Sequence, residues 1–212
     1  MIALPYITVR TRNEGGFAGL IELNNITGIV ITSELGNAGT EVLFGCFLKP
    51  PSTNYKSVKW IARILKFQRP LLGFSEVYLI GLENVAGFNR GVALVFNMDK
   101  KGNPKATFKS HSESVTISLN PFVFHEYEIR WYPNKFELYI DKHLVATLNT
   151  IIKCPLLPFA ETCSHISLIL SPFSHLITTY KPVRAHLMLF VGPLPEIIEH
   201  IINQEGLFNK IV

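Results

Sequence analysis

The chain has 212 residues, of which 48% are hydrophobic and 17% charged, so it is long enough for one full hydrophobic core and short for two. The charged fraction is below the roughly 25% of an average soluble domain, and the composition excludes a disordered tail and a coiled coil. Twenty Lys and Arg against sixteen Asp and Glu give a net charge of +4. The longest basic run is Lys100-Lys101, which argues against nucleic acid as a partner.

Three cysteines, Cys46, Cys154 and Cys163, form no CxxC pair. The odd count argues against a disulfide framework, so reduced thiols are expected, with a bridge between Cys154 and Cys163 as the alternative if the chain matures outside a reducing compartment. The first residues lack the basic and apolar regions of a signal peptide. The apolar stretches are far shorter than the ~18 to 20 residues that cross a bilayer, so no membrane span is expected.

Most segments alternate apolar and polar residues with period two, which predicts an all-β chain. The pattern is clearest where Tyr127, Ile129 and Trp131 share one face and Pro133-Asn134 turns the chain into a second alternating run. A further turn at Asp141-Lys142 predicts a three-strand meander over residues 125–148. Other strands are expected at 6–10, 28–33, 41–49, 58–67, 75–82, 91–97, 106–109, 114–119, 165–170 and 183–191.

Ten or more strands fit two packed antiparallel sheets, so a β-sandwich domain is expected over residues 1–194. Only the end of the chain has a helical pattern, which predicts a short C-terminal helix and tail over residues 195–212. The apolar stripe of this helix is expected to pack on the edge of the sandwich or, alternatively, on another subunit of a homo-oligomer. Four isoleucines form the stripe: Ile197, Ile198, Ile201 and Ile202.

The stretch from Phe124 to Asp141 reads FHEYEIRWYPNKFELYID. It is similar to a family pattern that runs His-x-Tyr-x-(Ile/Val)-x-Trp-x-Pro, followed by an apolar alternation that ends in Val-Asp-Gly. The run from Thr40 to Pro50 likewise resembles the family strand that ends in Lys-x-Pro. From about residue 28 to 191 the chain therefore resembles the concanavalin A-like lectin and glucanase jelly roll, and within it the laminarinase- and lichenase-type glycoside hydrolases. The resemblance implies a jelly-roll sandwich.

Glycoside hydrolases of this type carry a strand motif Glu-x-Asp-x-Glu or Glu-x-Asp-x-x-Glu, because a retaining mechanism needs a nucleophile and an acid about 5 Å apart. In the corresponding segment Glu76 matches the nucleophile, but the Asp position is Tyr78 and the acid position falls on Ile80 or Gly81. A bulge near Gly81 would return Glu83 to the face of Glu76, one strand step further away than the motif allows. We therefore expect no catalytic residues and no glycoside hydrolase activity.

No motif of another catalytic class is present, neither a G-x-S-x-G elbow nor H-E-x-x-H. Asp occurs only at Asp99 and Asp141, which argues against a calcium site. The histidines are too widely and irregularly spaced to specify zinc. We expect no metal and no cofactor.

Two functions fit these observations. The first is a non-catalytic, lectin-like carbohydrate-binding protein, because aromatic faces and polar side chains hold sugars. Trp60 is then either a sugar platform or an ordinary core residue. The second is a structural or assembly subunit of a capsid, spike or fibre, whose isoleucine stripe is buried against a neighbouring protein subunit. The candidate ligand-binding residues are Trp60, Glu76, Tyr78, Glu83 and Arg90.

Overall fold

The computed structural model describes residues 7–12, 16–23, 26–33, 39–44, 47–66, 74–84, 91–98, 103–165 and 185–190. These residues form fourteen strands and, within the described ranges, no helix. The helix expected over residues 195–212, with its four isoleucines, lies outside them. The strands are β1 (Ile7–Arg12), β2 (Gly16–Leu23), β3 (Ile26–Ser33), β4 (Gly39–Phe44), β5 (Lys56–Lys66), β6 (Phe74–Glu83), β7 (Val92–Met98), β8 (Pro104–Ser110), β9 (Ser114–Ile117), β10 (His125–Trp131), β11 (Phe136–Ile140), β12 (His143–Leu148), β13 (Leu157–His165) and β14 (Ala185–Phe190).

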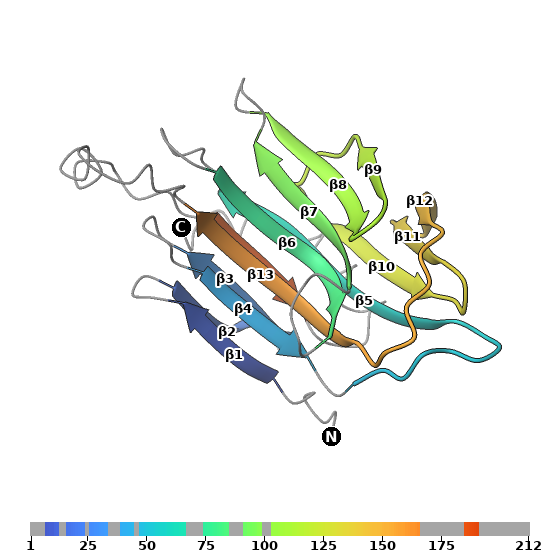
Figure 1. Cartoon of the computed structure of the whole chain (residues 1–212). Coiled ribbons are helices and arrows are strands. Elements are labelled where there is room, and N and C mark those ends of the chain that lie inside the picture. The colour runs from blue at the N-terminus through green and yellow to red at the C-terminus, as the bar shows by residue number, and fades with distance from the viewer. Residues whose placement is uncertain are drawn as a thin grey trace, which may run out of the picture.

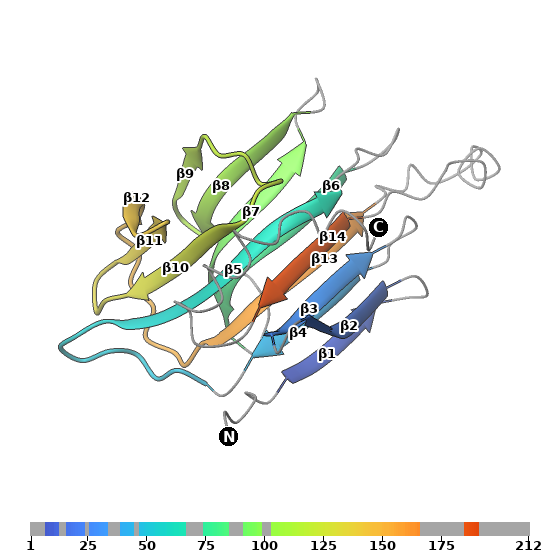
Figure 2. The same ribbon diagram turned by 180° about the vertical axis from the view of Figure 1, so that it is seen from behind.

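Two antiparallel sheets of seven strands each lie face to face. Sheet A, in front in Figure 1, has the order β1-β4-β13-β6-β7-β8-β9. Sheet B has the order β12-β11-β10-β5-β14-β3-β2 and is seen from its own side in Figure 2. Six of the twelve neighbouring pairs in the two sheets are not consecutive in sequence, and the chain crosses repeatedly between the sheets. This is the expected all-β, two-sheet sandwich.

The core lies between the sheets, because alternate residues of each strand point inward. Tyr127, Ile129 and Trp131 of sheet B are fully buried in one cluster with Val77 and Phe96 of sheet A. Each such side chain contributes roughly 1.5 to 3 kcal/mol of burial free energy, so this single cluster is the main source of stability. No helix in the described part of the chain is long and apolar enough to cross a membrane.

The predicted meander over residues 125–148 is confirmed, since β10, β11 and β12 pair in sequence. β13 runs from Leu157 to His165, over residues where almost no strand was expected, and of the strand expected at 165–170 only His165 is described. The sequence pattern missed β13 because Pro158 lies near its start, and proline usually argues against a central strand. Here the pairing of β13 with β4 begins only after it, at Phe159. Residues 166–170 lie outside the described residues.

Candidate functional site

β6 carries the candidate site because a β-bulge interrupts its alternation. Its pairing with β7 shifts between Tyr78 and Ile80, and both Leu79 and Ile80 are buried in the core between the sheets. After the bulge the faces of the strand are exchanged. Gly81 therefore lies on the outer face of sheet A, on the side opposite the core. A bulge near Gly81 was the condition for Glu83 to return to the face of Glu76, and it is present.

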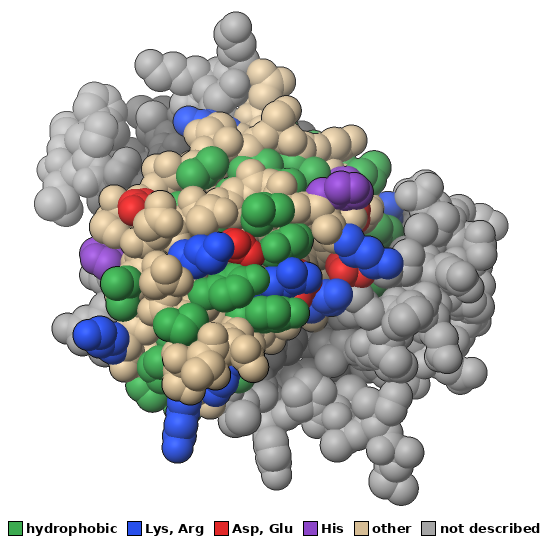
Figure 3. All heavy atoms as spheres, turned by 90° about the vertical axis from the view of Figure 1, so that its right-hand side faces the viewer, with side chains coloured by type: hydrophobic (Ala, Val, Ile, Leu, Met, Phe, Trp, Pro, Cys, Tyr) green, Lys and Arg blue, Asp and Glu red, His purple; other side chains and the backbone are tan. Residues whose placement is uncertain are grey.

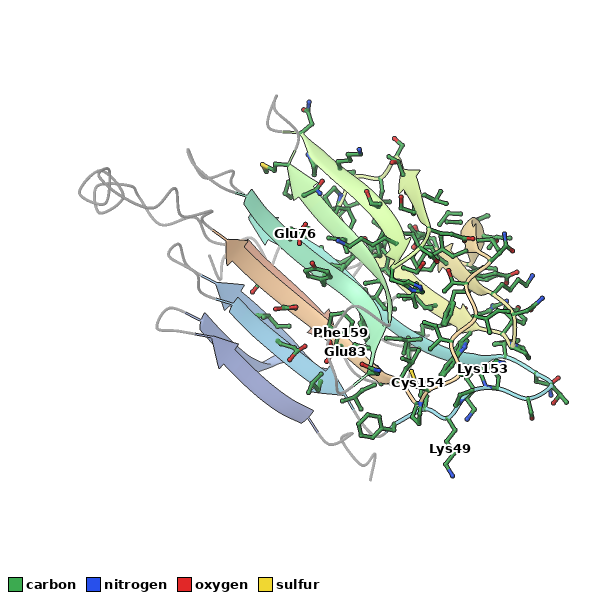
Figure 4. All side chains as sticks on the ribbon, in the orientation of Figure 1. Lys49, Glu76, Glu83, Lys153, Cys154 and Phe159 are labelled. Atoms are coloured by element: carbon green, nitrogen blue, oxygen red, sulfur yellow. The ribbon has the colours of Figure 1, made fainter. Side chains whose placement is uncertain are left out.

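A second hydrophobic cluster lies on this outer face, separate from the core. Tyr78 and Phe159 belong to it, and their rings are 6.1 Å apart at an angle of 39°. Phe159 also covers Gly81, because a Cβ atom added there would lie 2.6 Å from Cζ of the Phe159 ring. The ring thus occupies the place where any side chain at position 81 would begin. Figure 4 shows Glu76, Phe159 and Glu83 along this face.

Glu76 and Tyr78 form a hydrogen-bonded pair at one end of the face. The Tyr78 hydroxyl donates to Oε2 of Glu76 at 2.6 Å. The ammonium group of Lys109 lies 5.3 Å from the centre of the Tyr78 ring, a cation–π contact. Because β7 separates β6 from β8, the Lys109 side chain crosses over β7 to reach this ring. Carboxylate, phenol and ammonium groups therefore converge on one spot.

Partly exposed polar side chains extend from this spot across β7, β8 and β9. Residues directly opposite each other on paired strands share a face, and the registers pair Glu76 with Asn97 and Asn97 with Lys105. The inward residues between them on β8, Ala106 and Phe108, are buried in the core. We call the outward set the polar strip: Glu76, Asn97, Lys105, Thr107, Lys109, Ser114 and Thr116.

Two carboxylates that the sequence analysis missed lie on the same outer face. Glu41 of β4 and Glu161 of β13 are directly opposite each other, and Glu161 is also opposite Tyr78. They are 8% and 7% exposed. Glu161 was missed because no strand was expected over residues 157–164, where β13 lies. Glu41 fell at the start of an expected strand, where alternation alone gives no reason to single out a carboxylate.

The structure corrects the role of Trp60. Its side chain is 5% exposed and belongs to the core between the sheets, where Nε1 donates to the Leu79 carbonyl oxygen at 2.9 Å. Trp60 is therefore a core residue and cannot be a sugar platform. Glu76, Tyr78 and Glu83 lie on the same outer face of β6. Tyr78 is hydrogen-bonded to Glu76, whereas Glu83 lies at the far end of the strand and is 6% exposed. Arg90 lies outside the described residues.

The outer face of sheet B carries a network of ion pairs and stacked rings. Arg130 binds both carboxylate oxygens of Glu128 at 3.0 Å and lies 3.9 Å from the centre of the Tyr139 ring. Tyr139 donates to Glu137 at 2.9 Å. Burial alone would raise the pKa of Glu137, but hydrogen bonds from Lys135, Tyr139 and Tyr132 outweigh it and lower that pKa. Figure 3 shows such Lys and Arg side chains beside carboxylates.

Cys154 is a free thiol, so the alternative of a bridge to Cys163 is wrong. Its Sγ accepts a long hydrogen bond, 3.7 Å, from Nδ2 of Asn84. Among the residues that the structure describes, no group of three or more His, Cys, Asp or Glu side chains is placed to hold a metal ion.

No family model and no curated protein sequence matches the chain, but solved structures do. The PL7 alginate lyase AlyA1 from Zobellia galactanivorans is similar with a TM-score of 0.54 at 8% identity, over 80% of this chain and 79% of the lyase. The alginate lyase from Corynebacterium sp. gives 0.51 at 12% identity, over 77% of this chain and 74% of its own. The fold is the concanavalin A-like jelly roll.

The laminarinase catalytic domain from Thermotoga petrophila is similar at a TM-score of 0.49 and 16% identity, over 84% of this chain and 80% of its own. The two alginate lyases confirm the jelly roll expected from residues 124–141 as a fold. Identities this low carry over no activity, because one fold serves many unrelated functions.

Proposed function

We propose that this jelly roll is a lectin-like, non-catalytic glycan-binding protein and that the polar strip binds the sugar, with Tyr78, which is 8% exposed, holding Glu76 in place. One observation carries the proposal. On the outer face of β6 Tyr78 donates a hydrogen bond to Glu76, while the ring of Phe159 fills the place of a second carboxylate at Gly81. The face therefore keeps groups that bind hydroxyls and lacks a carboxylate at the acid position.

The spacing and burial of the carboxylates support the proposal that the protein is non-catalytic. A retaining glycosidase needs a nucleophile and an acid about 5 Å apart, and an inverting one needs roughly 6.5 to 9.5 Å. Glu76 is partnered by Tyr78, and Glu83 lies seven residues along the strand, about 20 Å away even after allowance for the bulge. Glu41 and Glu161 are adjacent, but both are more than nine-tenths buried. Neither Glu76 with Glu83 nor Glu41 with Glu161 therefore forms an open pair at a catalytic spacing.

Sugar binding fits the groups that remain accessible. Sugars are held by hydrogen bonds from precisely placed polar side chains. The strip offers a carboxylate at Glu76, a carboxamide at Asn97 and hydroxyls at Thr107, Ser114 and Thr116, all at least partly exposed. They project from four neighbouring strands of one sheet, so their relative positions are fixed by the sheet.

An assembly subunit is the alternative. It is favoured by exposed apolar side chains, of which Leu144 is 52% and Ile151 58% exposed. Exposed apolar area of this kind is typical of contacts between subunits when it is contiguous. The isoleucine stripe at 197–202 lies outside the described residues and stays a prediction.

The test is a glycan array with the purified protein, with its mass in solution measured by light scattering on the same sample. Glu76→Gln and Tyr78→Phe each remove one member of the Glu76–Tyr78 pair and are expected to weaken a reproducible hit about tenfold or more, since hydrogen bonds to charged groups contribute about 1.5 to 3 kcal/mol. The matched control is Glu137→Gln with Tyr139→Phe, which removes the equivalent Glu-x-Tyr pair from sheet B and should leave binding unchanged.

Each outcome decides between the functions. A hit lost in the sheet A variants but retained in the control supports the proposal, provided that no reducing ends are released from the bound glycan. Release of reducing ends would overturn the non-catalytic part. A blank array from a folded sample, together with an oligomeric mass, would overturn glycan binding in favour of the assembly subunit.

A further inference from the structure

We infer that the polar strip selects glycans bearing carboxylate or sulfate groups over neutral ones. The inference rests on the proposed function and adds to it the chemical class of the ligand. It is based on how charge is distributed between the strands of the outer face.

Among the described side chains of β6, β7, β8 and β9, positive charge on this face is concentrated on β8. Lys105 is exposed and Lys109 half-buried, and both project outward because they alternate with the core residues Ala106 and Phe108. On β9 the outward residues are Ser114 and Thr116. Among the described residues of these two strands, therefore, every outward side chain is cationic or neutral.

Negative charge lies on the other side of β7. The outward carboxylates Glu76 and Glu83 are on β6, and Glu41 and Glu161 are on β4 and β13. Two strand spacings, about 9 to 10 Å, separate β6 from β8. At Glu76 one carboxylate oxygen already accepts a hydrogen bond from the Tyr78 hydroxyl. An anionic substituent over Lys105 would thus meet an ammonium group two strand spacings from β6, whereas one at Lys109 would meet an ammonium group that lies against the Tyr78 ring, on the side of Glu76.

The two lysines are spaced along β8 as an extended ligand would require. Lys105 and Lys109 are four residues apart on one strand, about 13 Å between Cα atoms. Thr107 lies between them, and its register partner is Thr116, while Ser114 is opposite Lys109. A linear glycan lying along β8 can place an acidic group at each lysine and its hydroxyls at the residues between. A single small anion cannot contact both.

Binding driven by these lysines should depend on salt, because exposed charges are screened within about 10 Å at 0.1 M ionic strength. The experiment measures dissociation constants by calorimetry for three probes of equal length: a uronic acid oligosaccharide, a sulfated galactan oligosaccharide and a neutral β-1,3-glucan oligosaccharide. Each probe is measured at 50 and 300 mM NaCl, with wild type and with Lys105→Gln/Lys109→Gln.

The control variant is Lys49→Gln/Lys153→Gln, which lowers the net charge by the same amount. Both lysines are exposed and lie at the lower end of the molecule in Figure 4, away from the outer face of β8. We expect the strip variant to bind an anionic probe roughly tenfold more weakly, as two charge-assisted contacts are lost. The control should bind it within about twofold of wild type, because screened charges far from the ligand contribute little.

The outcomes separate this inference from the proposed function. Tighter binding of the uronate or the sulfate probe, weakened by salt and by the strip variant alone, supports the inference and identifies the acidic group. Equal binding of the neutral probe, unaffected by the strip variant, overturns the charge selectivity and leaves glycan binding in place. Equal loss in both variants also overturns it, because the attraction would then be non-specific. If no probe binds to folded protein, the proposed function fails as well.

Discussion

At the residue scale, one pair of side chains explains why the stretch that resembles the laminarinase pattern has a histidine at its start and an aspartate at its end. His125 opens the stretch and Asp141 closes it, and Nδ1 of His125 lies 2.6 Å from Oδ2 of Asp141. The other oxygen of Asp141 accepts the backbone N–H of Glu126 at 2.9 Å. The pattern places His and Asp sixteen residues apart because the β10–β11 hairpin brings them together. These positions hold the fold and say nothing about a ligand.

The turn after Asp141 gives the first prediction. Asp141 and Lys142 have φ values of 50° and 69°, as in the two-residue hairpin loops that favour Asn-Gly or Asp-Gly. Because a left-handed conformation costs a residue with a Cβ atom roughly 1 to 2 kcal/mol, Lys142→Gly is expected to raise the free energy of unfolding by about 0.5 to 1 kcal/mol. Urea unfolding measures this change. Lys142→Ala, which keeps a Cβ atom, is the control; an equal gain there would contradict the explanation.

At the element scale, β6 is defined by its bulge. A strand of strict alternation would place Glu83 toward the core, whereas the shift at Leu79 places it on the outer face with Glu76 and Tyr78. The same shift brings Gly81 beneath the Phe159 ring of β13. The outer face of β6 is therefore set jointly by two strands that are far apart in sequence.

The contact between Gly81 and Phe159 gives a second prediction. Gly81→Ala forces a Cβ atom against the ring and is expected to cost about 1 to 3 kcal/mol, the range for overpacking. In a Phe159→Ala background the clash is gone, so the same substitution should cost less than about 0.5 kcal/mol. A double-mutant cycle by urea unfolding measures the difference. Additive effects of the two substitutions would show that the ring does not occupy this place.

The sequence predicts these elements unevenly, for physical reasons. Local alternation is strong in residues 125–148, where pairing is sequential, and that meander is correct. The sequence left undecided whether Trp60 lies in the core or on the surface, because its face depends on pairing with β10, more than sixty residues away. The pair Glu41 and Glu161 could not be found, since only the non-local pairing of β4 with β13 brings them together. Alternation cannot predict which side chains meet at a site that is assembled from strands distant in sequence.

At the scale of the whole molecule, both sheets contribute to one core, and both tryptophans belong to it. Trp60 and Trp131 are in the same buried cluster as residues of β6, β7 and β8. Two sheets that share the large core cluster of the described residues should lose it together.

The third prediction is therefore a single unfolding transition. Tryptophan fluorescence, which follows the core, and far-ultraviolet circular dichroism, which follows the strands, are expected to give the same urea midpoint and the same slope. Fluorescence that changes before the strands unfold would contradict a shared core and indicate that the sheets separate first.

The two outermost strands at one end of the sandwich are poor templates for pairing with other chains. β9 has four residues, and the pairing of β12 with β11 is interrupted by a bulge between Leu138 and Tyr139. Short or bulged edge strands hinder edge-to-edge association. Contacts between copies at this end would therefore have to use side chains such as Leu144 and not extend the sheet.

The Phe159 ring over Gly81 also constrains how this sequence can change. A glutamate at position 81 would need its first side-chain atom where the ring now lies, so a protein that acquired it alone would be destabilised before it could gain an acid. The ring would have to be reduced first, at a cost of about 3 to 5 kcal/mol for Phe to Ala. Under the proposed function, a path to a hydrolase through position 81 thus crosses a less stable intermediate. The order of the two substitutions changes how unstable the intermediate is, but either order passes through one.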